Sequence, residues 1–221
     1  MDRLLKQEIA GIINKIQRGD APPYSGDEGD MLTQNTSLHT FGIVDTKVNR
    51  QIITDPESGA ARYINGNEDD TYSLKFICYD EYLHRFVYDD GEGNLKKSRL
   101  PNREKMADYI VIDTSEDKQY IIIHELCEGD VANKRNKGKK QLSATINLLY
   151  KSVEVGNYID SFKNKICYLS AKDGRDVKTN GLADGFMDAY LILPEPQPFN
   201  FGQIGTKKFK AFESSIVKLD K

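Results

Sequence analysis

The alternation of hydrophobic and polar positions is clearest in residues 107–153. Two apolar runs, 107–113 and 119–126, flank a polar turn, which predicts two strands joined as an antiparallel hairpin. A lysine-rich segment follows, and apolar residues then recur at helical spacing. The pattern therefore predicts a strand, a turn, a second strand, a basic loop and a helix that runs from about Lys139 to Val153.

The rest of the chain carries weaker patterns. Apolar residues at helical spacing predict a helix within residues 1–20. Runs rich in β-branched and aromatic residues predict a hairpin of strands 71–78 and 84–88, and a further strand at 165–170. Residues 194–221 form a C-terminal extension, and its proline-rich start predicts a connector without regular structure.

These elements together predict one domain, residues 1–221, of the α/β (α+β) class, with a mixed central β-sheet flanked by helices. The chain has 38% hydrophobic and 29% charged residues, and no apolar run is long enough to cross a bilayer. Its first residues lack the apolar core of a signal peptide, and its three cysteines form no disulfide framework. We therefore expect a cytoplasmic protein without a membrane partner, and the sequence leaves its oligomeric state open.

The charge pattern restricts any contact with nucleic acid to a local site. The formal net charge is −3 and the isoelectric point is about 5.7, whereas proteins that coat nucleic acid are basic overall. The strong basic cluster consists of Lys134, Arg135, Lys137, Lys139 and Lys140. This cluster predicts either a phosphate-binding site or a solvated loop.

Two carboxylates are candidates for metal binding. Because side chains two residues apart on a strand share a face, an antiparallel hairpin brings Asp108 and Glu125 near the same end and the same side. Paired carboxylates suit Mg²⁺, which prefers oxygen ligands. Two alternatives remain open: Asp108 caps the strand while Glu125 pairs with Lys139 or Lys140, or the pair is Asp113 with Glu125.

The start of the predicted helix suits an anion. Its expected first turn holds Lys139, Lys140 and Gln141. A helix N-terminus offers free N–H groups and the positive end of the helix dipole, and cations there are unfavourable unless an anion lies nearby. The sequence therefore predicts a phosphate beside this turn.

The order of these elements resembles the PD-(D/E)XK nuclease superfamily, whose core is a restriction-endonuclease-like αβββαβ arrangement around a mixed sheet. The resemblance rests on Asp108, on the triplet Glu125-Leu126-Cys127 and on the Gln141-Leu142 pair in the following helix. It covers residues 107–170 and extends weakly to the N-terminal helix. Cys127 stands where the family has lysine, and some members move that lysine to the following helix, where this chain has Lys139 and Lys140.

The resemblance implies a metal-dependent nuclease that acts on nucleic-acid phosphodiester bonds. Asp108 and Glu125 would hold Mg²⁺ or Mn²⁺, Lys139 or Lys140 would stabilise the developing charge, and Gln141 would orient water or a phosphate. Three further residues would follow the nucleic-acid backbone: Lys134, Arg135 and Lys137. The alternative is a catalytically inactive protein of the same fold that serves as a binding or assembly module.

His124 is a weaker candidate for chemistry. On a regular strand it projects to the face opposite Glu125 and Cys127, so it cannot activate that thiol. A packed, hydrogen-bonded histidine is the expected interpretation. Histidine and cysteine spacings along the chain match no zinc-binding pattern.

Overall fold

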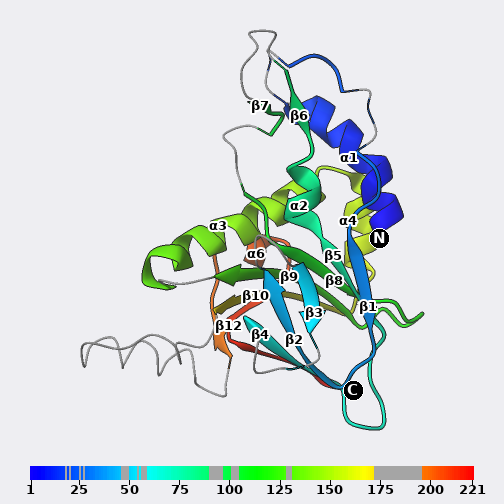
Figure 1. Ribbon diagram of the computed structural model, residues 1–221, viewed down its shortest axis with the longest axis vertical. Helices are drawn as coiled ribbons and strands as arrows, with labels where there is room; N and C mark the ends of the chain where they lie inside the picture. Colours follow the sequence, from blue (N-terminus) through cyan, green and yellow to red (C-terminus); the bar gives the residue numbers. More distant parts are fainter. Residues whose placement is uncertain are drawn as a thin grey trace.

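A large mixed sheet forms the centre of the computed structural model, and the pattern at 107–127 lies in its middle (Figure 1). The structure describes residues 1–17, 19, 21–24, 26, 28–45, 50–53, 55, 59–89, 97–100, 105–127, 131–171 and 196–221. Within these residues the large sheet has seven strands, in the order β1 (Thr33–Thr36), β5 (Leu74–Cys78), β8 (Tyr109–Asp113), β9 (Tyr120–Cys127), β10 (Asn164–Ala171), β12 (Lys210–Glu213) and β11 (Gln197–Pro198).

The pairing of neighbouring strands in the large sheet changes from antiparallel to parallel at β9. β5, β8 and β9 pair antiparallel, whereas β10 runs parallel to both β9 and β12. The predicted hairpin is confirmed, since Tyr109 lies opposite His124 and Ile112 lies opposite Ile121. The parallel step from β9 to β10 needs a crossover connection, and the helices between them supply it.

A smaller sheet covers one face of the large one. Its four described strands follow the order β13 (Ile216–Leu219), β4 (Ala61–Asn65), β2 (Thr40–Asp45) and β3 (Arg50–Ile53). Inward-facing residues of the two sheets, including Phe41, Tyr63, Phe76 and Ile122, form one buried cluster. A separate short pair, β6 (Val87–Tyr88) with β7 (Lys97–Ser98), lies apart from both sheets.

Helices cover the opposite face (Figure 1). They are α1 (Asp2–Ile16), α2 (Tyr79–Leu83), α3 (Val131–Leu149), α4 (Val153–Asp160) and α6 (Gln203–Thr206). The apolar stripes of α1 and α3, for example Ile9, Ile13, Leu142 and Ile146, belong to one buried cluster with strand residues such as Ile123. The mixed sheet flanked by helices is thus as the sequence predicts. Among the described residues, no helical segment combines the length and apolar character needed to span a bilayer.

Three local predictions are wrong. The helix begins at Val131 rather than Lys139, and a new helix begins at Val153, where the Ser152 hydroxyl accepts the N–H of Val155 as an N-cap. The run 71–78 does not pair with 84–88, because α2 follows β5 at once and β5 pairs with β1 and β8.

The third correction lies at the start of the C-terminal extension. The proline-rich segment was expected to hold no regular element, but Gln197–Pro198 form β11 at the sheet edge. An edge strand tolerates proline, since the missing N–H need not face a partner. Predictions that fall on residues 172–195 lie outside the described residues.

Candidate functional site

Asp108 and Glu125 lie on the same face and at the same end of the β8–β9 hairpin. Asp108 directly precedes β8, and continuing the pairing of Tyr109 with His124 by one residue places Asp108 opposite Glu125. Their strand neighbours on that face, Ile110 and Ile123, belong to the helix-covered core. Each carboxylate-bearing residue is only 5% exposed.

Asp113 does not belong to this pair. It lies at the other end of β8 and alternates with Ile112, which places it on the face toward the small sheet. Its oxygens accept the N–H groups of Ser115 and Gln119 and the Ser115 hydroxyl, at 2.7–3.0 Å. The alternative that pairs Asp113 with Glu125 is therefore wrong, and Asp113 shapes the turn of the hairpin.

Asp108 also ties the two strands together. Its Oδ2 accepts the backbone N–H of Leu126 at 2.8 Å, and its backbone carbonyl accepts the N–H of Tyr79 at 3.0 Å. The strand-capping role weighed from the sequence is thus present. It leaves the carboxylate beside the end of β9, where Glu125 lies.

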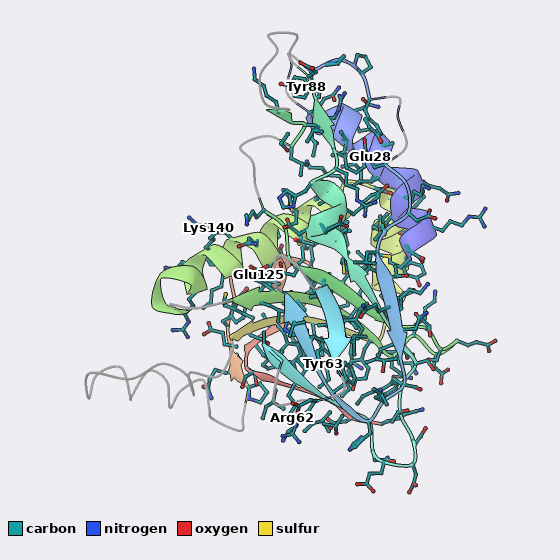
Figure 2. All side chains as sticks on the ribbon, viewed as in Figure 1. Glu28, Arg62, Tyr63, Tyr88, Glu125 and Lys140 are labelled. Atoms are coloured by element: carbon teal, nitrogen blue, oxygen red, sulfur yellow. The ribbon has the colours of Figure 1, made fainter. Side chains whose placement is uncertain are left out.

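Helix α3 packs closely over these strand ends because of Gly138. A Cβ atom on Gly138 would come within 2.5 Å of Leu169 Cδ1 and within 3.3 Å of both Cys127 Sγ and Glu125 Cγ. Glycine in mid-helix costs about 1 kcal/mol relative to alanine, and here it permits this contact. Glu125 therefore lies directly beneath α3 (Figure 2), and the buried thiol of Cys127 lies beside it.

The basic residues are not at a helix N-terminus, which corrects the phosphate prediction. Lys139, Lys140 and Gln141 lie about two turns inside α3, where the backbone N–H groups already bond within the helix. The segment predicted as a basic loop is helical. Lys134 belongs to the first turns of α3, and its side chain lies outside the described residues.

Two of the predicted phosphate-binding residues instead bind an acidic side chain. Arg135 Nη2 and Lys139 Nζ each lie 2.5 Å from the carboxylate of Glu213 on β12, which is 8% exposed. Lys139 Nζ also lies 4.5 Å from the centre of the Phe199 ring. The predicted pairing of Lys139 with Glu125 is thus replaced by an ion pair with Glu213.

The other basic residues line a groove of about 540 Å³ on the outer side of α3. Its described lining residues are Lys105, Lys137, Lys140, Gln141, Ser143, Ala144, Asn147, Phe201 and Gln203. All three lysines are exposed. Figure 2 shows Lys140 on α3, above Glu125.

Gln141 and Thr145 hold the segment that leads into Asp108. Gln141 Nε2 donates to the carbonyl of Met106 at 3.1 Å. Thr145 Oγ1 accepts the N–H of Ala107 at 2.7 Å and donates to the carbonyl of Gln141 at 2.8 Å. Both side chains are buried, and Gln141 also lines the groove, so this residue links the groove to the segment before Asp108.

His124 takes the structural role expected for it. It is fully buried, with Nδ1 2.7 Å from the Tyr63 hydroxyl and Nε2 2.7 Å from the Ser170 hydroxyl. Ser170 donates its proton to the carbonyl of Ser214, so it accepts the Nε2–H, and Nδ1 accepts the Tyr63 proton. Burial lowers the pKa of His124 to about 3.

The donor set at Asp108 and Glu125 suits a hard cation, since carboxylate oxygens are the ligands that Mg²⁺ prefers and Mg²⁺ is commonly held by one or two carboxylates. Larger clusters are not seen: in the part of the chain that the structure describes, no three His, Cys, Asp or Glu side chains gather into a metal site.

No motif in the sequence marks Glu213, Lys105 or Phe201 as residues of the site. Glu213 is separated from α3 by the whole of β10 and the segment after it, so no local pattern links them.

Comparisons of the chain with protein-family models, curated proteins and solved structures give no match.

Proposed function

We propose that this chain is a divergent, metal-dependent nuclease-like protein that acts on nucleic-acid phosphodiester bonds. The observation that carries the proposal is the pair Asp108 and Glu125, two carboxylates at one end and on one face of the β8–β9 hairpin. A groove with three exposed lysines adjoins the segment that leads into Asp108. Acidic metal ligands beside phosphate-binding cations are what phosphodiester hydrolysis requires.

The element order supports the same proposal. Along the chain, α1 precedes β5, β8 and β9, the crossover through α3 follows, and β10 then lies beside β9. When the intervening elements β1–β4, α2, β6, β7 and α4 are set aside, this order supports the αβββαβ core that the resemblance implies. The further strands β1, β11 and β12 extend the sheet at both edges.

The proposed roles differ among the basic residues. Mg²⁺ or Mn²⁺ held by Asp108 and Glu125 would polarise a phosphoryl oxygen and lower the pKa of a bound water. Lys140 and Lys137 would hold the phosphate backbone, because their ammonium groups are exposed in the groove. Gln141 would keep the segment before Asp108 in position through its bond to Met106.

A second candidate function has its own support. Cys127 stands in the lysine position, buried beneath Gly138, and Lys139 is held by Glu213. A thiol supplies no fixed positive charge. These contacts favour a catalytically inactive protein of this fold that binds nucleic acid or assembles with a partner.

The test measures Mn²⁺ binding by calorimetry and Mn²⁺-dependent cleavage of labelled DNA and RNA. We expect Asp108→Asn and Glu125→Gln to abolish Mn²⁺ binding and to lower cleavage by at least about a hundredfold, since both remove a ligand charge at nearly constant volume. In Asp108→Asn the side-chain amide oxygen can still accept the Leu126 N–H, so folding should be retained.

Asp113→Asn is the matched control, because Asp113 is also a buried carboxylate, at the other end of β8 from Asp108 and on the opposite face of the sheet. It should leave binding and cleavage unchanged. A well-folded wild type that neither binds Mn²⁺ nor cleaves either nucleic acid would reject the enzyme and favour the binding module.

A further inference from the structure

Two segments of the chain form the walls of the groove on the outer side of α3. One stripe of the helix holds positions i, i+3, i+4, i+7 and i+10, which are Lys137, Lys140, Gln141, Ala144 and Asn147. The opposite wall is the segment 201–203, which precedes and enters α6.

The second wall is held against α3 by close contacts. The N–H of Gln203 donates to Ser143 Oγ at 2.8 Å. Gly202 has a φ of +52°, and a Cβ atom there would come within 2.2 Å of Ser143 Oγ. The segment thus requires glycine at position 202, and the groove is formed before any ligand binds.

The charge of the groove is one-sided. Lys105, Lys137 and Lys140 line it, and none of its described lining residues is acidic. Two other basic residues of α3, Arg135 and Lys139, differ because they are paired with Glu213. The groove therefore attracts a polyanion, although the chain as a whole carries a net charge of −3.

Phe201 adds a flat apolar surface at this charged site. Its side chain is half-buried, packed in part against the helix-covered core, and it also lines the groove. An aromatic ring beside phosphate-binding lysines is the usual arrangement for an unpaired base, whose face is free to stack. In a duplex the neighbouring base pairs already cover that face. Gln203 and Asn147 offer amide groups within reach of a base edge.

We propose that the groove holds a single strand of nucleic acid, with phosphates on the three lysines and one base stacked on Phe201. This inference rests on the proposed function, since it names the form of the substrate at the same site. A strand in the groove passes beside Lys105, three residues before Asp108 in the chain.

The test is fluorescence anisotropy of the full chain in EDTA. The probes are labelled oligothymidylate, oligouridylate, a DNA duplex of equal length and an oligoglutamate peptide. We expect both single strands to bind more tightly than the duplex, by about fivefold or more, because one stacked base contributes at least that factor. Equal binding of the duplex, or preferred binding of the peptide, would overturn the inference.

Variants then test the two parts of the groove. Phe201→Leu keeps an apolar side chain against the core, and it should weaken single-strand binding by about fivefold or more while leaving duplex binding unchanged. Lys137→Gln and Lys140→Gln should each reduce the slope of log affinity against log salt by about 0.7. Lys218→Gln, an exposed lysine on β13, is the matched control and should change neither quantity. Wild-type affinity and slope in the groove variants would contradict the assignment.

The two proposals fail separately. Strand binding that depends on Phe201, in a protein that neither binds Mn²⁺ nor cleaves, would reject the nuclease and keep the groove. Mn²⁺-dependent cleavage that needs Glu125 and is unchanged by Phe201→Leu and Lys140→Gln would reject the groove and keep the nuclease.

Discussion

His124 and Glu125 are consecutive residues of β9, yet they lie in different surroundings on opposite faces of the large sheet. His124 faces the small sheet, and both its ring nitrogens bond to side chains, Tyr63 and Ser170 (Figure 2 labels Tyr63). Glu125 faces α3 and lies beneath Gly138. The same helix contributes Lys137 and Lys140 to the lysine-lined groove. Burial alone therefore does not identify a site: the hydrogen-bonded network around His124 is structural, and the carboxylates Asp108 and Glu125 are the functional candidates.

The largest expected difference between the two residues is in stability. His124→Ala removes a fully buried ring and leaves the Tyr63 and Ser170 hydroxyls without their partner, so it should lower the free energy of unfolding by about 3 kcal/mol. Glu125→Gln should change it by less than about 1 kcal/mol, since the shape is retained. Urea unfolding followed by circular dichroism measures both. A larger loss for Glu125→Gln would reverse the two roles.

The pH dependence of stability should separate the residues further. Folding lowers the pKa of His124 from about 6.5 to about 3, so below pH 6.5 the unfolded chain binds a proton that the folded chain does not. His124 therefore favours folding fully above pH 6.5. This contribution falls by up to about 1.4 kcal/mol per pH unit as the pH decreases toward 3.

The measurement is urea unfolding of the wild type and of His124→Gln at several pH values between 4 and 8 (a range set around the unfolded pKa). Subtracting one curve from the other removes the contribution of the carboxylates, which titrate in both proteins, to the pH dependence of the free energy of unfolding. Parallel curves would show that folding does not lower the pKa of His124.

The smallest expected effect concerns the two mid-helix glycines. Gly138→Ala should lower the free energy of unfolding by about 1 kcal/mol, since the new methyl group meets Leu169 and overpacking outweighs the gain in helix propensity. Gly11→Ala in α1 meets nothing within 4 Å and should instead stabilise by about 0.5–1 kcal/mol. Equal stabilisation by both variants would mean that α3 does not need its close approach over Glu125.

Part of the fold was predictable because it rests on local periodicity. The strands 109–113 and 120–127 alternate clearly, so their hairpin, their faces and the position of Asp108 opposite Glu125 follow from the sequence. The N-terminal helix follows from its apolar stripe. The start of α3 could not be predicted from the sequence, because its first turns are polar and contain Gly138, a composition that also fits a loop.

The remaining errors come from contacts between distant segments. The pairing of Lys139 with Glu213 and the bond from Tyr63 to His124 join residues 74 and 61 positions apart in the sequence. No local sequence pattern indicates which acidic side chain will form an ion pair with a given lysine. The groove could not be predicted for the same reason, since Lys105 precedes α3 in the sequence and Phe201 lies far after it.

The placement of β12 and β13 has a consequence for how the chain folds during synthesis. These two strands are separated by only Ser214 and Ser215, yet β12 joins the large sheet and β13 joins the small one, beside β4. The large sheet therefore has all its described strands only after residue 213 has left the ribosome, and the small sheet only after residue 219 has. The β4–β13 pairing closes a loop of about 150 residues, which is slow to form, so one edge of β4 stays open until β13 has been synthesised.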